Sequence, residues 1–203
     1  MREDFLTLLS VRPPGAVLEI GCGTGDTGGA ALQRGVARAY HGCELDPASA
    51  ARAADALTSV TVGDVEMLDL PWPAHTFDTL LMSEVLEHLR DPWAAVRKVA
   101  ATLKPGTLVL ASSPNVTHHK ILRALWRGGF TCTDVGPMDR THLRWFTPRT
   151  YAAMFEDPGI DITRVRPRSG LGPKARWLNR LTLGRLPRHL FQMQVCVEGR
   201  KRG

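Results

Sequence analysis

The sequence predicts an α/β fold, with a seven-stranded, mostly parallel sheet, helices on both faces and a lid after the fifth strand. Short apolar segments typical of strands alternate with stretches of helical pattern, which indicates strand–helix–strand units and a parallel sheet. The segment at 77–83 is nearly all apolar, as expected of a strand that is covered on both faces. The 203 residues suit one core, so we expect residues 1–203 to form a single domain.

The elements follow in order along the chain. A short amphipathic helix opens it, with an apolar face made of Phe5, Leu6, Leu8 and Leu9. Further helices begin at Asp46-Pro47 and at Asp91-Pro92, where proline suits the first helical position, and the second runs to about Leu103. The last strand, 191–199, is expected to be antiparallel at or near an edge. The strands are expected at residues 16–20, 37–45, 59–64, 77–83, 107–112, 161–167 and 191–199.

Residues 114–150 interrupt this alternation just after the fifth strand. Insertions at the carboxyl ends of parallel strands lie over the crevice in which such sheets bind ligands. We therefore predict that this segment is a lid that supplies substrate contacts, with Gly128-Gly129 and Gly136-Pro137 as points of flexing.

The composition indicates a cytoplasmic protein. No apolar run approaches the ~20 residues that a membrane span needs, and the first ten residues carry acids where a signal peptide carries bases. The four cysteines (Cys22, Cys43, Cys132 and Cys196) form no C-x-x-C pair, which favours reduced thiols. The sequence does not indicate an oligomeric state.

Charge is distributed unevenly along the chain. Residues 161–203 carry a formal charge of +9, and residues 1–160 carry −3. Such a basic segment can serve an anionic partner, such as nucleic acid, a phosphorylated substrate or a membrane surface. The favoured interpretation is a solvated helix face, because apolar residues interleave the charges; these are Trp177, Leu178, Leu181 and Leu183.

The strongest signal is the string VLEIGCGTG at 17–25, in which a buried strand runs into Gly21, Gly23 and Gly25. Such a turn lets the backbone bend sharply and approach a ligand closely. With Glu19 just before it and G-x-G-x-G spacing, the string resembles motif I of the class I S-adenosylmethionine (SAM)-dependent methyltransferases. The resemblance implies a Rossmann-like fold, SAM as cofactor, and a turn that holds the methionine portion of SAM.

Acids at the following strand ends agree with this resemblance. Glu44 ends the second strand, where a carboxylate can accept both ribose hydroxyls, and Asp46 is the lesser candidate. The resemblance places Asp64 at the adenine amino group, Val65 at the adenine edge, and Met82 and Ser83 beside the sulfonium. A nicotinamide dehydrogenase is the weaker alternative, because LKPG at 103–106 and SSPN at 112–115 are typical of methyltransferases.

Polar residues gather where the transferred methyl group should emerge. Glu84, Glu87 and His88 are spaced to share a face of one helical turn, and His142 lies in the expected lid. His88 or His142, with Glu87, can act as a catalytic base on a hydroxyl. Alternatively, all four side chains bind a divalent metal that makes the hydroxyl more acidic. A third alternative is that they only pack and cap a helix.

The E-x-x-E-H pattern with a later histidine resembles the O-methyltransferases of ubiquinone biosynthesis and those that methylate the 3′-terminal ribose of small RNAs. The run from SSPN to DRTHLRWFTPRTY resembles bacterial methyltransferases of glycans and secondary metabolites. The resulting prediction is methyl transfer from SAM to a hydroxyl of a small molecule or sugar. The alternatives are N-, C- or S-methylation, RNA 2′-O-methylation with nucleic acid as the less favoured partner, and a SAM-binding regulatory module without catalysis.

Overall fold

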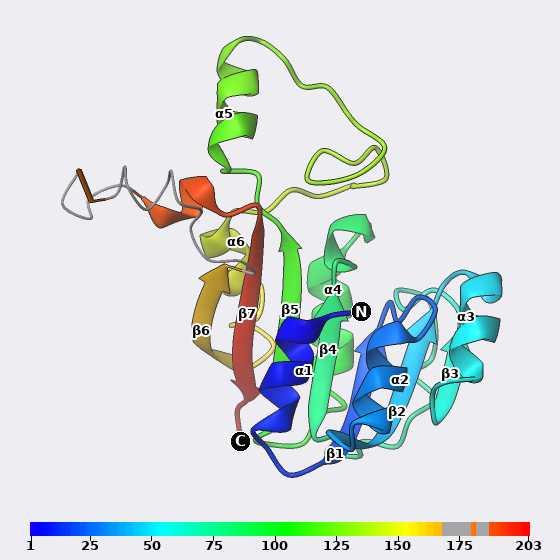
Figure 1. Cartoon of the computed structure of the whole chain (residues 1–203). Coiled ribbons are helices and arrows are strands. Elements are labelled where there is room, and N and C mark those ends of the chain that lie inside the picture. Colours follow the sequence, from blue (N-terminus) through cyan, green and yellow to red (C-terminus); the bar gives the residue numbers. More distant parts are fainter. Residues whose placement is uncertain (168–179, 182–186) are drawn as a thin grey trace.

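Strand β1 (Gly15–Ile20) lies in the parallel part of a seven-stranded sheet in the computed structural model, which describes residues 1–167, 180–181 and 187–203 (Figure 1). The strand order is β3-β2-β1-β4-β5-β7-β6. The first five strands of this order, β3, β2, β1, β4 and β5, are parallel to one another. Strand β7 runs antiparallel to β5 and to the edge strand β6. The predicted sheet is therefore confirmed, including the antiparallel last strand near an edge. The other strands are β2 (Ala37–Glu44), β3 (Ser59–Val62), β4 (Thr79–Ser83), β5 (Leu108–Pro114), β6 (Ile160–Pro167) and β7 (Gln194–Lys201).

Helices cover both faces of the sheet because the side chains of β1 alternate between them. Val17 packs with Leu6 and Leu9 of α1 on one face, whereas Leu18 packs with Val96 of α4 and Tyr151 of α6 on the other. The helices are α1 (Glu3–Ser10), α2 (Asp26–Gln33), α3 (Pro47–Ala54), α4 (Pro92–Ala100), α5 (His119–Trp126) and α6 (Pro148–Ala153). The predicted two-sided covering is confirmed.

Both Asp-Pro helix starts are confirmed. The carboxylates of Asp46 and Asp91 each accept the backbone N–H three residues further on, at 2.9 Å, which satisfies a donor that the helix itself cannot pair. Helix α4 ends at Ala100 instead of Leu103, because Thr102 and Leu103 close tighter turns with carbonyls three residues back. Helix α1 buries its apolar face as predicted; Phe5, Leu6 and Leu9 are buried and Leu8 is half-buried.

The last strand begins three residues later than the sequence indicates, at Gln194 instead of 191, because Arg188–Phe191 form the 3-10 turn η2. The predicted basic helix at 177–183 lies mostly outside the described residues. Within the part of the chain that the structure describes, no helix is both long enough and apolar enough to cross a membrane.

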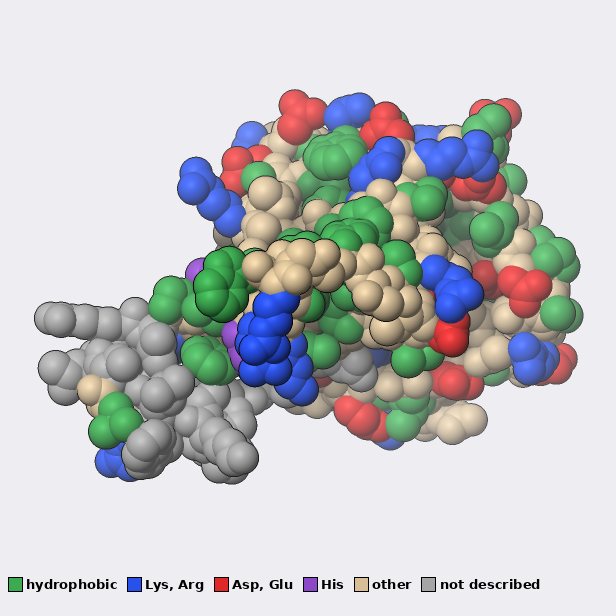
Figure 2. Space-filling view, turned by 90° about the horizontal axis from the view of Figure 1, so that it is seen from above, with side chains coloured by type: hydrophobic (Ala, Val, Ile, Leu, Met, Phe, Trp, Pro, Cys, Tyr) green, Lys and Arg blue, Asp and Glu red, His purple; other side chains and the backbone are tan. Residues whose placement is uncertain are grey.

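The segment between β5 and α6 stands over the carboxyl ends of the parallel strands and carries α5 (Figure 1). Asn115 fixes its base, because its side-chain amide donates to the carbonyls of His189 and Gln192 at 2.8 Å. Farther out the segment is more exposed: Ile121 is the buried residue of α5, while Trp126 is 86% exposed. Figure 2, which views the molecule from this end, shows basic side chains gathered beside hydrophobic ones. The site lies beneath this segment.

Candidate active site

The turn after β1 is built from glycines in left-handed backbone conformations. Gly21, Gly23 and Gly25 have φ values of 72°, 55° and 80°, which glycine adopts without the steric cost of a Cβ. At Gly21 a Cβ would also lie 2.9 Å from a methyl carbon of Val85, just beyond β4. The predicted turn therefore forms and packs closely against the carboxyl end of β4.

Glu44, at the end of β2, holds this turn in place. One carboxylate oxygen accepts the Gly23 N–H at 2.8 Å, and the other accepts the Asp46 N–H at 3.0 Å. Asp46 uses its own carboxylate to cap α3. Of the two acids that the sequence proposes for the ribose, Glu44 is thus the one that borders the glycine turn and the adjoining cavity.

A cavity of about 380 Å³ opens beside the turn, at the carboxyl ends of β1, β2 and β4. Gly21 and Glu44 line it together with Asp64 and Val65, which follow β3. The Asp64 carboxylate accepts the Glu66 N–H at 2.8 Å, which fixes its orientation. Residues from three successive strand ends therefore meet at one cavity, as the sequence predicts.

Four of the residues expected at the cofactor do not line this cavity: Gly23 and Gly25 of the turn, Glu19 and Ser83. Glu19 is 3% exposed and accepts the Tyr40 hydroxyl at 2.8 Å, and burial raises its pKa to about 7. The Ser83 hydroxyl accepts a hydrogen bond from Arg2 at 2.6 Å. The Glu19 side chain is therefore bonded to β2, and the Ser83 side chain to Arg2.

Glu84 departs from the expected geometry. It has a left-handed backbone with φ of 54°, and the helical part of this stretch is the 3-10 turn η1 (Leu86–His88). The Glu84 N–H still pairs with the Ser112 carbonyl at 3.0 Å, so strand pairing continues to Glu84 and the chain then turns away. The expected helical turn shared by Glu84, Glu87 and His88 is therefore wrong.

Glu87, His88 and His142 converge nonetheless, because the inserted segment brings His142 back over η1. One ligand-capable atom from each residue lies within 4.8 Å of the others. The Glu87 side chain is 1% exposed, and neither carboxylate oxygen makes a hydrogen bond of normal geometry with the described residues, although the Ser113 hydroxyl lies near enough to interact weakly. Burial, together with the charge of Glu84, raises the pKa of Glu87 to about 8. A buried carboxyl group with so few hydrogen bonds is rare in proteins, and coordination of a cation is one of the roles that such a group serves.

The hydrogen bonds of the two histidines indicate which ring nitrogen keeps a lone pair. His142 Nδ1 lies 3.3 Å from the Pro137 carbonyl, and His88 Nδ1 lies 3.3 Å from the Thr141 carbonyl. Because a carbonyl only accepts hydrogen bonds, these contacts favour the tautomer in which Nδ1 carries the proton and Nε2 keeps its lone pair. The Thr141 hydroxyl also lies 3.2 Å from His88 Nδ1, and it favours the same tautomer because it donates its own proton to Asp139. Burial, with the neighbouring His88, lowers the pKa of His142, which favours the neutral ring. The Nε2 lone pair of each imidazole can therefore bind a metal or accept a proton.

A second cavity, of about 490 Å³, adjoins the first beneath the inserted segment. Glu84 and His88 line both cavities and form their shared wall. Glu87, His142 and Asp139 line the second cavity. Two ligands bound in these cavities would meet at this wall.

A family model described as a methyltransferase domain matches residues 2–165. The chain belongs to the class I SAM-dependent methyltransferases. The probable SAM-dependent methyltransferase of Mycolicibacterium smegmatis is 35% identical to it over 146 residues, which cover 72% of this chain and 52% of that protein. The ubiquinone biosynthesis O-methyltransferase of Neisseria meningitidis serogroup A is 28% identical over 160 residues, covering 74% of this chain and 65% of that protein.

This methyltransferase thus spans between about half and two thirds of the length of these relatives. A crystal structure of a SAM-dependent methyltransferase from Archaeoglobus fulgidus superposes with a TM-score of 0.70 at 17% identity, over 99% of this chain and 95% of that one. At this identity the likeness concerns the fold, and it agrees with the predicted Rossmann-like architecture.

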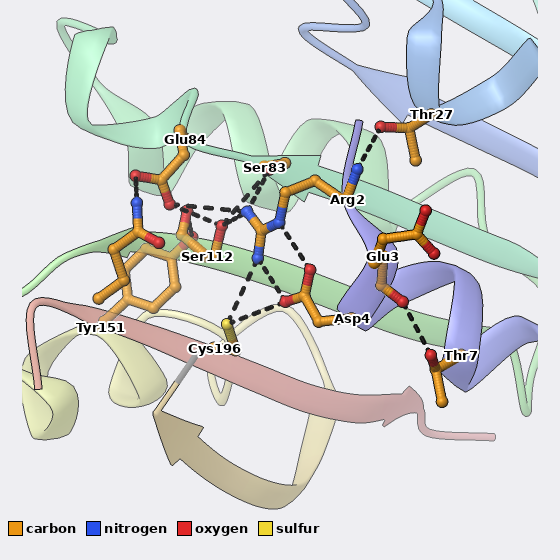
Figure 3. Close-up of polar contacts among 11 residues, drawn as sticks. Arg2, Glu3, Asp4, Thr7, Thr27, Ser83, Glu84, Ser112, Tyr151 and Cys196 are labelled. Carbon is orange, nitrogen blue, oxygen red and sulfur yellow. Dashed lines mark hydrogen bonds and ion pairs between the residues drawn. The ribbon is translucent and has the colours of Figure 1, made fainter. Parts of the chain in front are cut away.

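Sequence patterns do not point to Arg2, which lies at the centre of a buried polar network in this methyltransferase (Figure 3). Its guanidinium donates to Ser83 and Ser112 at 2.6 Å each and pairs with Asp4 at 2.7 Å. Burial alone would lower the pKa of Arg2, but the hydrogen bond and charge of Asp4 reverse this and raise it. Because Arg2 and Ser112 are 110 residues apart, the contact becomes visible only in the folded chain.

Proposed function

We propose that this methyltransferase transfers the methyl group of SAM to a hydroxyl of a small molecule or sugar, assisted by a divalent cation. In this proposal Glu87, His88 and His142 hold the cation. The observation that carries it is the convergence of two imidazoles on a buried carboxyl group whose oxygens make no hydrogen bond of normal geometry with the described residues. Such nitrogen and oxygen donors suit Mn²⁺, Fe²⁺, Co²⁺ or Zn²⁺.

SAM would occupy the cavity of about 380 Å³. Glu44 would accept the ribose hydroxyls, Asp64 the adenine amino group, and Val65 would contact the adenine edge. The glycine turn would hold the methionine portion. Gly21 supplies backbone at the cavity wall, whereas Glu19 would act only through the turn, because its carboxylate is buried against Tyr40.

The acceptor would occupy the second cavity, with its hydroxyl at the wall formed by Glu84 and His88. An alcohol is a poor nucleophile until it is deprotonated, and a bound dication would lower its pKa. The Nε2 lone pairs of His88 and His142 would bind the cation, and Glu87 would add a negative charge once the cation displaces its proton. The word O-methyltransferase in the name of the Neisseria relative supports oxygen as the acceptor atom.

The cation can be tested without knowing the acceptor. Calorimetric titration with Mn²⁺ should show one site in the wild-type protein and none after His142→Ala. His119→Ala is the matched control, because His119 lies in the same segment but its Nδ1 donates to the Leu190 carbonyl at 2.9 Å, away from the cluster. Equal Mn²⁺ binding by wild type and His142→Ala would contradict the cation site.

The acceptor atom is tested with methyl-labelled SAM and three probes: 3,4-dihydroxybenzoate, methyl glucoside and histamine. We expect label on a hydroxyl probe, loss of transfer after chelation and recovery with Mn²⁺. Full hydroxyl methylation after exhaustive chelation would leave His88 or His142 as a simple base. Transfer to histamine alone would identify an N-methyltransferase.

A further inference from the structure

The carboxylate of Glu84 is held from several directions at the wall between the two cavities (Figure 3). One oxygen accepts the Ser112 hydroxyl at 2.7 Å, and the other accepts the Gln194 amide at 2.7 Å. The left-handed backbone of Glu84 is costly for a residue with a side chain and persists only where its surroundings impose it. The orientation of Glu84 is therefore imposed by its partners.

Arg2 lies at the start of this chain of contacts. Its guanidinium donates to the Ser112 hydroxyl, and that hydroxyl donates in turn to Glu84. The fork of the guanidinium also holds Ser83, the residue before Glu84, and lies 3.9 Å from Glu84 itself. A planar group with several fixed donors can make these contacts together, which a lysine ammonium at the end of a flexible chain cannot reproduce.

We propose that Arg2 is a positioning residue for methyl transfer, which acts through Ser112 to fix Glu84 at the wall shared by the cofactor and acceptor cavities. The proposal rests on the proposed function in taking the cavity beside the glycine turn as the SAM site. It does not depend on the cation or on the identity of the acceptor.

A purely structural role for Arg2 makes a different prediction. Arg2 pairs with Asp4 of α1, and its backbone N–H donates to the Thr27 hydroxyl of α2 at 3.1 Å. These contacts also join α1 to the sheet and to α2. If Arg2 only anchors α1, its replacement should disturb cofactor binding whether or not Glu84 carries a carboxylate. If it acts through Glu84, the effect should vanish once that carboxylate is gone.

The test is a double-mutant cycle with Arg2→Lys and Glu84→Ala, with the affinity for S-adenosylhomocysteine measured by calorimetry and thermal unfolding measured in parallel. Charge-assisted hydrogen bonds of this kind correspond to about tenfold in affinity. We therefore expect Arg2→Lys and Glu84→Ala each to weaken binding at least about fivefold. In the Glu84→Ala background, Arg2→Lys should change affinity less than about twofold.

Arg12→Lys is the matched control, because Arg12 pairs with Glu198 at 3.1 Å and borders a cavity at the other end of the sheet. It should bind S-adenosylhomocysteine like the wild type. If Arg2→Lys fails to fold, Ser112→Ala breaks the same relay while keeping the buried guanidinium and should give the same coupling with Glu84→Ala. Additive effects, or unchanged affinity in Glu84→Ala, would overturn the proposal; a wild-type protein that binds no S-adenosylhomocysteine would instead overturn the assigned SAM cavity.

Discussion

Substitution of Glu87 by glutamine should stabilise the metal-free protein while abolishing its response to metal. In the unfolded chain this carboxyl loses its proton near pH 4.5, whereas in the folded protein burial and the charge of Glu84 hold its pKa at about 8. The folded state therefore binds more protons between these values, and stability falls as pH rises from about 4.5 to 8. The variant lacks this titration.

The size of the effect follows from the same values. Each pH unit in the window corresponds to about 1.4 kcal/mol. The quantity to compare is the free energy of unfolding of Glu87→Gln minus that of the wild type. This difference should be about 3 kcal/mol larger at pH 7 than at pH 4, and about 5 kcal/mol larger above pH 8 than at pH 4, as upper estimates. Urea unfolding in the presence of a chelator, at pH 4, 7 and 8.5, measures this difference.

Metal should offset most of this difference at pH 7 and about half of it above pH 8. At Mn²⁺ concentrations about a hundred times the Kd, a ligand that binds only the folded state stabilises it by about 2.7 kcal/mol. The wild type should gain this stabilisation and Glu87→Gln should not. Glu156→Gln, at an exposed carboxylate, is the control and should follow the wild type in both series. A stability difference that does not change with pH, or equal gains with Mn²⁺ in both proteins, would refute the reasoning.

Three further outcomes are expected. Glu44→Ala should weaken SAM binding about tenfold or more by calorimetry, because it removes the carboxylate that holds the glycine turn and faces the proposed ribose site; an unchanged Kd would contradict that role. Glu19→Gln should weaken SAM binding less than Glu44→Ala, and at pH 8 it should be more stable than the wild type by up to about 3 kcal/mol, because burial raises the Glu19 pKa to about 7 and stability is lost between about pH 4.5 and 7. Amide hydrogens of α5 should exchange faster than those of β4 without ligand, because α5 buries little apart from Ile121, as a lid over residues 114–150 requires; equal protection would argue against a mobile lid.

The cofactor side of the site could be predicted from the sequence because parallel topology determines it. Once the strands are recognised, their carboxyl ends must share one edge, and Gly21, Glu44 and Asp64 follow three of those ends. The alternation of side chains along β1 also predicts which face of the sheet Glu19 points to, and the sequence interpretation did not take this into account. Glu19 and Val17 point to the same face of β1, the face covered by α1 and α2.

The acceptor side was less predictable because it depends on contacts between distant segments. The left-handed backbone of Glu84 removes it from the helical spacing that the pattern E-x-x-E-H suggests. Arg2 reaches Ser112 across 110 positions, so no local motif could reveal it. His142 was expected near the cluster, but the hydrogen bonds that select its tautomer depend on the fold of the inserted segment.

The location of both cavities follows from the change of direction in the strand order. After β3 the chain crosses β1 to place β4 on its other side, so the connections leaving β1 and β4 diverge and open a crevice between them. The glycine turn lies on one side of that crevice, and Glu84 lies where β4 ends on the other. Because β5 pairs with β4 up to Ser83 and Ser112, the relay from Arg2 through Ser112 reaches Glu84 at the point where the crevice passes into the second cavity. The same topology that opens the cofactor cavity therefore places a fixed carboxylate between the proposed methyl donor and its acceptor.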